Sequence, residues 1–167
     1  MTIAASDFKS VQAHLAGAVT IITTRDAEGQ PWGLTATSFC SLSLDPPLVL
    51  FCLALSADCY NAFINSRHFA VNILAARQCE LSDRFATKNI AKFEGVPYTE
   101  GKTGSPLLPG CLAQMECSVQ TIHPGGDHVI IVGLAEYGHH GTHEHTASPL
   151  LYYARAYGTY ACLPEKL

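Results

Sequence analysis

The segment on which the architecture of this chain depends reads Trp32-Gly33-Leu34-Thr35-Ala36-Thr37-Ser38-Phe39-Cys40-Ser41-Leu42-Ser43-Leu44-Asp45-Pro46-Pro47. It places hydroxyls and small residues between two apolar strands and stops at a double proline. Gly33 and Ala36 keep the backbone open, because neither carries a bulky side chain. Peptide N–H groups and the hydroxyls of Thr35, Thr37 and Ser38 can therefore approach a phosphate or a flat polar ring closely. This pattern favours a nucleotide-like cofactor.

A second segment, far downstream, forms the other half of the predicted site. It reads Gly125-Gly126-Asp127-His128-Val129-Ile130-Ile131-Val132-Gly133, so it begins with a tight turn and delivers a histidine at the mouth of a buried strand. We expect the two segments to form opposite walls of one site.

The composition predicts one domain, residues 1–167. Of the 167 residues, 48% are hydrophobic and 14% are charged, which suits a single domain with a true core. The formal net charge is −4 and the ten Lys and Arg residues are scattered, so no basic stripe is offered to nucleic acid or to an anionic membrane. No apolar run reaches the roughly 18 residues that cross a bilayer, and no signal peptide is evident. These patterns predict a soluble, cytoplasmic protein.

The sequence contains two groups of potential metal ligands, and we predict a metal site in neither. The seven cysteines contain no C-x-x-C pair and lie mostly in apolar segments, which is typical of reduced core thiols in the cytoplasm. The cluster His139-His140-Gly141-Thr142-His143-Glu144-His145 has donors for a divalent transition metal. Its spacing matches neither H-E-x-x-H nor a zinc finger, so we interpret it as a solvated loop.

The apolar pattern predicts a mainly β fold. The spacing of Phe8, Val11 and Leu15 predicts a short amphipathic helix over residues 6–15. Alternation over 115–121 predicts a strand with one wet face, formed by Gln114, Glu116, Ser118 and Gln120. Strands are also predicted over 18–24, 32–43, 48–55 (covered on both faces), 69–74, 128–137 and 150–160, helices over 57–64 and 78–86, and a long surface loop over 94–110.

Strands at short spacing, with helices in only two connections, favour an antiparallel barrel with peripheral helices over a doubly wound parallel sheet. We expect the apolar face that the barrel leaves over to receive a partner subunit. G-x-S-x-G, P-loop and G-x-G-x-x-G motifs do not occur, so hydrolase, phosphotransfer and Rossmann functions lack support.

Eight motifs, which follow one another from about Gly17 to Tyr157, resemble those of a known family. They are the segment 33–47, Phe69-Ala70-Val71-Asn72-Ile73-Leu74, Phe85-Ala86, Phe93-Glu94-Gly95-Val96, Gly104-Ser105-Pro106-Leu107-Leu108, Glu116-Cys117, Gly126-Asp127-His128 with Gly133, and Pro149-Leu150-Leu151-Tyr152. With these motifs the chain resembles the short-chain flavin reductases of two-component flavin monooxygenases, within the wider group of FMN-binding split-barrel proteins.

The resemblance implies a fold, an activity and partners. The fold would be a six-stranded antiparallel split β-barrel of Greek-key type, in a homodimer with the flavin near the subunit interface. The activity would be that of an NAD(P)H:flavin oxidoreductase (EC 1.5.1.-), in which NADH or NADPH passes a hydride to FMN or FAD. Reduced flavin would then leave for a partner monooxygenase. Such a reaction requires placement of two rings rather than a protein nucleophile.

The resemblance also assigns site residues. His128 would stand on the nicotinamide side as the catalytic residue, with Asp127 fixing its orientation. Lys88 or Arg84 would supply a cation for the phosphate. Ser56 is the candidate replacement for hydroxyls that are absent from Ala57-Asp58-Cys59, where the family shows Ser-x-Thr. The predicted cofactor-binding residues are Gly33, Thr35, Ala36, Thr37, Ser38, Ser56, Phe85, Ala86, Lys88, Asp127 and Tyr157.

Each assignment has a structural alternative. The hydroxyls of the first segment can bond across a sheet, Lys88 and Arg84 can belong to a solvated helix face, and His128 can simply close a hairpin. Arg155 follows the tyrosine pair one residue later than the family's arginine, so it does not inherit that role. Two other functions also stay open: a split-barrel flavoprotein that retains FMN and acts on another substrate, and a non-enzymatic flavin-binding protein.

Overall fold

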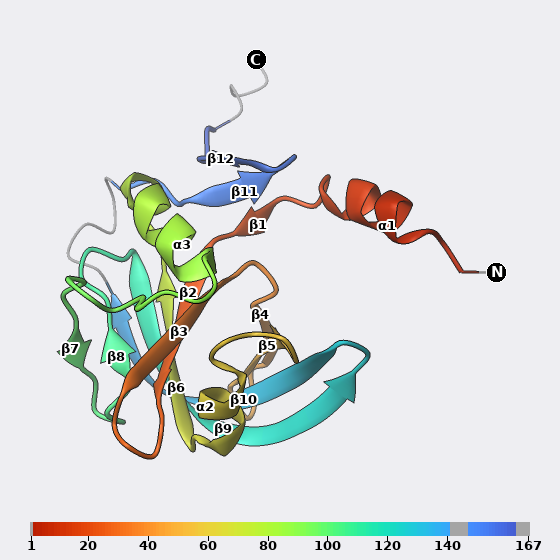
Figure 1. Cartoon of the computed structure of the whole chain (residues 1–167). Helices are drawn as coiled ribbons and strands as arrows, with labels where there is room; N and C mark the ends of the chain where they lie inside the picture. The colour runs from red at the N-terminus through yellow and green to blue at the C-terminus, as the bar shows by residue number, and fades with distance from the viewer. Residues whose placement is uncertain (1, 141–146, 163–167) are drawn as a thin grey trace.

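Figure 1 shows the computed structural model, which describes residues 2–140 and 147–162. Antiparallel strands are the main regular structure of these residues, and short helices lie around them. In chain order the elements are α1 (Ala5–Gln12), β1 (Gly17–Ala18), β2 (Thr20–Arg25), β3 (Pro31–Ala36), β4 (Cys40–Ser43), β5 (Leu48–Ala54), α2 (Tyr60–Asn65), β6 (His68–Ile73), the 3₁₀ turn η1 (Ala76–Gln78), α3 (Cys79–Ala86), β7 (Thr99–Glu100), β8 (Pro106–Leu107), β9 (Ala113–Gly125), β10 (His128–His140), β11 (Leu151–Tyr153) and β12 (Ala156–Gly158).

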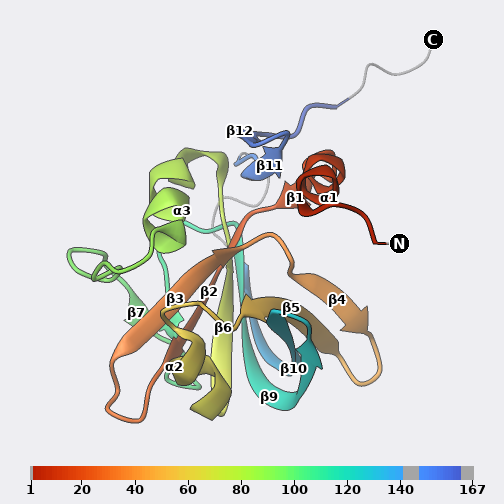
Figure 2. The ribbon, with the colours of Figure 1, turned by 45° about the vertical axis from the view of Figure 1, so that its right-hand side comes forward.

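The largest sheet has seven strands in the order β3-β2-β6-β9-β10-β5-β4, and all its neighbouring strands are antiparallel. β3 and β4 form its two edges, although only residues 37–39 separate them in the chain. This link spans at most about 14 Å, whereas a flat sheet of seven strands is roughly 29 Å wide. The sheet must therefore curl until its edges approach each other, and Figure 2 shows the link crossing the end of the curled sheet.

The predicted antiparallel barrel with peripheral helices is confirmed in its split form. No ladder joins β3 to β4 within residues 2–140 and 147–162, so the curled sheet stays open between these edges. The predicted strand over 32–43 is wrong in part, because the chain leaves the β3 ladder after Ala36 and enters a new one at Cys40. This break explains why the sheet has seven strands where six were expected.

Two apolar clusters hold the fold together. Inside the curled sheet the rings of Phe63 and Phe69 meet the ring of Phe51 edge to face, with centroid distances of 5.6 and 5.2 Å. Between α3 and the sheet, Ile21, Leu74, Phe85 and Leu108 form the second cluster. β5 contributes alternate residues to the interior, while the other residues of β5 are half-buried. The prediction that both faces of this strand are covered therefore holds for one face only within this chain.

The predicted surface loop over 94–110 is wrong in part. It contains the short ladder of β7 with β8, and residues 105–108 are buried. Val96 and Tyr98 pack against the cluster beneath α3. The many glycines and prolines in this segment indicate turns, but they do not reveal that its apolar residues cover the end of the sheet.

The predicted wet face of β9 is wrong at Glu116, whose side chain is fully buried. The carboxylate accepts hydrogen bonds from the N–H groups of Lys102 and Thr103, from the Thr103 hydroxyl and from the His139 ring, at 2.7 to 3.1 Å. It therefore anchors the segment between β7 and β8, because these donors replace the lost hydration of the charge.

The chain ends in a second, smaller sheet with the order β1-β11-β12. The predicted strand over 150–160 is wrong here, because Ala154 and Arg155 turn the chain back on itself. The predicted N-terminal helix forms as α1, but Phe8, Val11 and Leu15 remain exposed. None of the helices in residues 2–140 and 147–162 has the length and hydropathy that a membrane span requires.

Candidate functional site

A cavity of about 410 Å³ lies between β3, α3 and the β11–β12 hairpin. It brings together four of the predicted cofactor-binding residues, Thr35, Thr37, Ala86 and Tyr157. It also contains residues that were not predicted, including Ser82 and Asp83. A sequence signal for Ser82 exists: it precedes Ala86 by four positions, and such residues share one face of a helix.

The hydroxyls of this cavity differ in their freedom to meet a ligand. Thr35 donates to the carbonyl of Ser82 at 2.6 Å, so its hydroxyl joins β3 to α3. Tyr157 lies within hydrogen-bond distance of the Ser82 hydroxyl (2.9 Å) and of the Asp83 carboxylate (2.7 Å). Partial burial and the neighbouring Asp83 raise the pKa of Tyr157 above its usual value of 10.0. Within the described part of the chain the Thr37 hydroxyl makes no hydrogen bond, so it is available to a ligand.

Three predicted residues do not line this cavity. Phe85 is fully buried, so the prediction that it contacts a cofactor is corrected to a packing role. A Cβ on Gly33 would lie 2.8 Å from the Phe85 ring, which explains the glycine at this position. Ala36 is also buried, and its carbonyl accepts a hydrogen bond from the Thr20 hydroxyl at 2.8 Å.

β5 connects the first wall of the predicted site with the second. The Ser38 hydroxyl accepts a hydrogen bond from the N–H of Cys52 at 3.1 Å. Two residues further along the strand, Ala54 pairs with His128 of β10. This step is about 7 Å along a strand. The two segments that were expected to face one site therefore both contact the end of β5, at Cys52 and Ala54.

The cation predicted to meet a phosphate stands at the end of the same strand. Lys88 Nζ donates to the carbonyl and to the hydroxyl of Ser56, at 3.1 and 3.3 Å. Asp58, which as a free charge would repel a phosphate, instead accepts a hydrogen bond from the N–H of Asn89 at 2.6 Å. Asp58 thus fixes the loop that carries Lys88. A lysine ammonium has three donors, so one remains for a ligand.

Arg84, the other predicted cation, has a structural role. Its guanidinium donates to the carbonyls of Ala91, Lys92 and Glu94. These bonds hold the chain that follows α3 against the end of the helix. These bonds use Nε and Nη2 of Arg84, so Lys88 is the better candidate of the two for a phosphate.

His128 lies at the tip of the β9–β10 hairpin, half-exposed to solvent. Its Nδ1 is 2.7 Å from Oδ1 of Asp127, and this hydrogen bond lowers the pKa of Asp127 below its usual value of 3.8. The Asp127 carbonyl in turn accepts from the N–H of Leu55 at 3.0 Å. The histidine ring is thereby oriented, and its Nε2 is left to face a ligand.

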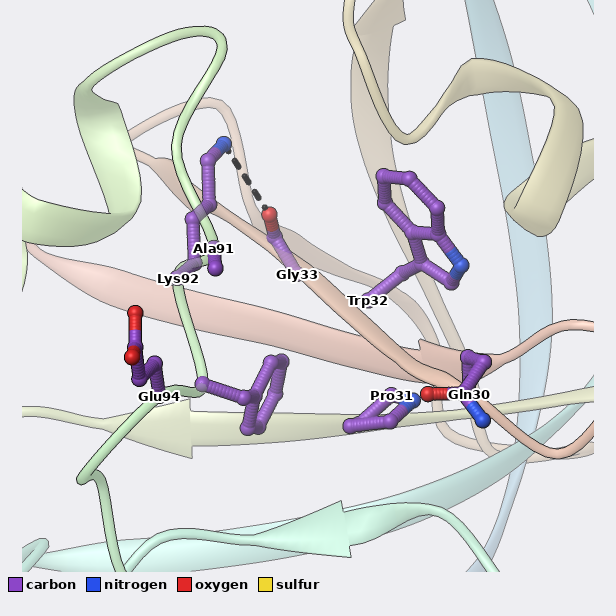
Figure 3. Close-up of a pocket in the computed structure, with 8 residues that line it drawn as sticks. Gln30, Pro31, Trp32, Gly33, Ala91, Lys92 and Glu94 are labelled. Atoms are coloured by element: carbon purple, nitrogen blue, oxygen red, sulfur yellow. Dashed lines mark hydrogen bonds between the residues drawn. The ribbon is translucent and has the colours of Figure 1, made fainter.

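A second cavity, of about 340 Å³, follows the outer edge of β3 (Figure 3). Gly33 and Lys92 line it together with the ring of Phe93, and Lys92 Nζ donates to the Gly33 carbonyl at 3.3 Å. The cavity lies along the edge where β3 has no neighbouring strand. Gly33 thus belongs to this cavity rather than to the one that contains Thr35 and Thr37.

The predicted histidine cluster falls mostly on residues 141–146, which lie outside the described residues. His139 is described, and its Nε2 bonds to the buried Glu116. Among residues 2–140 and 147–162 no three His, Cys, Asp or Glu side chains come together as metal ligands would. All seven cysteines are free thiols: Cys59, Cys111 and Cys117 are buried, Cys52 and Cys79 are half-buried, and Cys40 and Cys162 are exposed.

The fold and the site define a β protein of the split-barrel class, with a hydroxyl, a cation and an imidazole near its opening. The comparisons identify the family within this class. Residues 12–161 match the model of the flavin reductase like domain. The chain therefore belongs to the flavin reductase-like family.

Two relatives and one solved structure are similar over most of the chain. The reductase subunit HsaB of a flavin-dependent monooxygenase from Rhodococcus jostii is 43% identical over 75% of this chain and 64% of its own. The FMN reductase (NADH) SmoA from Agrobacterium fabrum is 42% identical over 75% of this chain and 71% of its own. The Streptomyces globisporus NADH:FAD oxidoreductase SgcE6, solved with NAD and FAD fragments, has a TM-score of 0.86 and 28% identity over 96% of this chain and 97% of its own.

The chain spans less than two thirds of the length of the first of these relatives, 64%. It spans 37% of another relative, a 44% identical protein from Rhizobium meliloti. The family model covers nearly the whole chain, whereas these two relatives are longer proteins.

Proposed function

We propose that this chain catalyses the reduction of FMN or FAD by NADH or NADPH, as an NAD(P)H:flavin oxidoreductase. The observation that carries the proposal is the meeting of three groups along the end of β5: the Ser38 turn, the Lys88–Ser56 pair and His128. The names of the relatives support it, since HsaB is called the reductase subunit of a flavin-dependent monooxygenase and SmoA an FMN reductase (NADH). We extend the proposal to a flavin-dependent monooxygenase as the partner that receives reduced flavin.

The residues around the opening suit a flavin. A bound flavin supplies a ring that accepts hydride at N5 and gains negative charge. Thr37 offers a hydroxyl that is free of other bonds, and Ala86 leaves room for a flat ring beside it. The remaining donor of Lys88 can meet a phosphate. Since neither the ring nor the phosphate would need to displace an existing side-chain bond, these residues hold the ligand without rearrangement.

His128 is the residue that we assign to the nicotinamide. The bond between Nδ1 and Asp127 fixes the plane of the imidazole. Nε2 can then hydrogen-bond to a carboxamide and keep the nicotinamide ring over the flavin. Catalysis in this site is therefore a matter of placing two rings at reacting distance.

The first experiment follows the loss of NADH absorbance at 340 nm with no flavin, with FMN and with FAD. We expect turnover only with added flavin. His128→Ala is expected to lower the rate about tenfold or more, while the flavin Kd, measured by fluorescence quenching, stays within twofold. His123→Ala is the matched control, because His123 is an exposed histidine of the same hairpin that bonds only to Thr121.

Three outcomes would contradict the proposal or its assignments. Flavin binding without any NADH oxidation would indicate a non-enzymatic flavin-binding protein. Turnover without added flavin by a protein that stays yellow after gel filtration would indicate a flavoprotein that retains its cofactor. Equal turnover of His128→Ala and the parent would remove His128 from the nicotinamide site.

We also propose that the chain forms a homodimer through the outer face of β5 and β10. The register pairs Leu48 with Leu134, Leu50 with Val132 and Cys52 with Ile130, so apolar side chains cover this face. Leu44, beside it, is 91% exposed. We expect a second copy of the chain to cover this exposed apolar face, since large apolar patches mark interaction sites and most oligomers are symmetric pairs of one chain. Sedimentation should give a dimer mass for the parent and for Gln120→Glu, and a monomer mass for Leu50→Glu; a monomeric parent would refute the proposal.

The free cysteines bear on the compartment. Seven thiols without a disulfide suit a reducing environment. We therefore propose that the protein works in the cytoplasm, where NADH and NADPH are also available.

A further inference from the structure

The cavity along the outer edge of β3, which we call the β3-edge cavity, has no part in the proposed reaction. Its volume is about 340 Å³, and residues 30–33 and 91–94 line it (Figure 3). None of these residues lines the cavity that contains Thr35 and Thr37, and Lys88 is not among them either. A volume near the lower end of the range for ligand pockets suits a molecule with one ring.

One wall of the β3-edge cavity is the ring of Trp32, the only tryptophan of the chain. Its indole N–H donates to Oδ2 of Asp26 at 2.7 Å, and Oδ1 accepts from the N–H groups of Glu28 and Gln30. The bond from the indole is the main cause that lowers the pKa of Asp26 below its usual value. Because the N–H already has a charged acceptor, the indole is oriented and presents apolar surface to the cavity.

Another wall is the ring of Phe93, which is also fixed in place. It meets the rings of Phe85 and Tyr98 edge to face, with centroid distances of 5.0 and 5.4 Å. The guanidinium of Arg84 holds the backbone on both sides of Phe93, because it donates to the carbonyls of residues 91, 92 and 94. Both aromatic rings are therefore in position before a ligand arrives, which reduces the entropy lost on binding.

The β3-edge cavity contains one cation and one carboxylate. Lys92 is half-buried, and its Nζ donates only to the Gly33 carbonyl, at 3.3 Å, so two ammonium donors remain. Glu94 is exposed, and within residues 2–140 and 147–162 no ion pair joins it to Lys92. A partly desolvated charge attracts an ion more strongly than a solvated one. The charge that this cavity favours on a ligand is therefore negative, at Lys92.

We propose that the β3-edge cavity binds a small aromatic carboxylate, with its ring against Trp32 and Phe93 and its carboxylate on Lys92. Aromatic rings pack offset or edge to face against such walls, and an ammonium binds a carboxylate through charge-assisted hydrogen bonds. The site is separate from the flavin opening, so the inference does not depend on the proposed reduction of flavin.

The experiment follows the indole N–H signal in proton–nitrogen correlation NMR spectra, because one tryptophan gives one such signal. Benzoate, benzamide and benzamidine are the probes, since they have nearly the same shape but are anionic, neutral and cationic. Acetate supplies the carboxylate without the ring. We expect benzoate to shift the signal saturably with a Kd of about 1 mM or lower. Benzamide should bind about tenfold more weakly, and benzamidine and acetate more weakly still.

Variants locate the probe. Lys92→Met should weaken benzoate about tenfold through loss of the charged donor, and should leave benzamide within twofold. Lys92→Arg keeps the charge, so benzoate should still bind more tightly than benzamide. Lys88→Met is the matched control, because this lysine lies in the same segment but outside the β3-edge cavity. The Kd of benzoate should stay within twofold in Lys88→Met, and likewise in the parent when FMN is added to saturation.

Four results would overturn the inference. The absence of a saturable shift with benzoate up to about 10 mM would show that the cavity takes no such ligand. Tighter binding of benzamidine than of benzoate would assign the recognition of charge to Glu94. An unchanged Kd of benzoate in Lys92→Met would remove the lysine from the site. Competition by FMN, or an equal loss in Lys88→Met and Lys92→Met, would place benzoate in the flavin opening.

Discussion

Replacing Glu116 by Gln should destabilise the fold by about 3 kcal/mol, and the geometry of the carboxylate sets this value. Oε1 accepts from the Lys102 N–H and from His139, and Oε2 accepts from the N–H and the hydroxyl of Thr103. A Gln side chain keeps one acceptor oxygen and presents an NH₂ group in place of the other. In either orientation one backbone N–H then loses its acceptor, which costs about 1–3 kcal/mol, and the remaining bonds weaken from charge-assisted to neutral.

The assay is urea unfolding at pH 7 and at pH 4. Burial alone would raise the pKa of Glu116, but the bonds from Thr103, His139 and Lys102 together hold it below the ordinary value of 4.5. A carboxyl whose pKa is lowered by folding contributes stability above its ordinary pKa, and this contribution is lost as the pH falls through the lower folded value. The difference between parent and Glu116→Gln should therefore be largest at pH 7 and smaller at pH 4.

Glu136→Gln serves as the matched control, because Glu136 is an exposed glutamate on the same hairpin. It should change the free energy of unfolding by less than about 0.5 kcal/mol. A loss below about 1 kcal/mol for Glu116→Gln at pH 7 would refute the reasoning. The same holds for a loss that is equal at both pH values.

Three further predictions concern packing, thiols and the site. Gly33→Ala should lower stability by about 1–3 kcal/mol in thermal unfolding, because the new Cβ would lie 2.8 Å from the Phe85 ring; an unchanged Tm would contradict this packing role. With a thiol reagent at pH 8 the native protein should label Cys162 first, and denatured protein all seven. Tyr157→Phe should cost about 1 kcal/mol and leave the far-UV spectrum unchanged, since only its hydroxyl bonds are lost. In the labelling experiment the buried thiols should react last, because burial raises the pKa of Cys59 and of Cys111 to about 11 and that of Cys117 to about 12.

The sequence was informative where periodicity reflects burial. Alternation located β9, and the turn at Gly126 and Asp127 that leads into β10 was predicted correctly. The same alternation was misleading at Glu116, because it shows which residues share a face of the strand but not what covers that face. The covering segment lies between β7 and β8, and nothing in its glycines and prolines indicates that its backbone N–H groups converge on a carboxylate.

The C-terminal hairpin was missed for a related reason. Sequence rules find two-residue turns through Asn and Gly, which enter the left-handed region readily. Ala154 and Arg155 carry no such signal, yet both adopt this conformation. Tertiary contacts outweigh local preference here: β11 is paired with β1 on its other side, and Ala154 bonds to Ala13. The departure from the family's arginine position thus coincides with the strained turn.

The location of the site follows from the way the main sheet curls. A closed barrel would pair every backbone group of its edge strands, whereas a split one leaves unpaired groups where its edges approach. Here the Ser38 hydroxyl accepts a hydrogen bond from the N–H of Cys52, beyond the end of the β4 ladder. Lys88 donates to the carbonyl of Ser56, which follows β5. Side chains that complete a broken ladder are polar by necessity and lie at the mouth of an apolar interior. A flat ring with a phosphate requires that combination, which is why we propose the cofactor site at this opening of the split barrel.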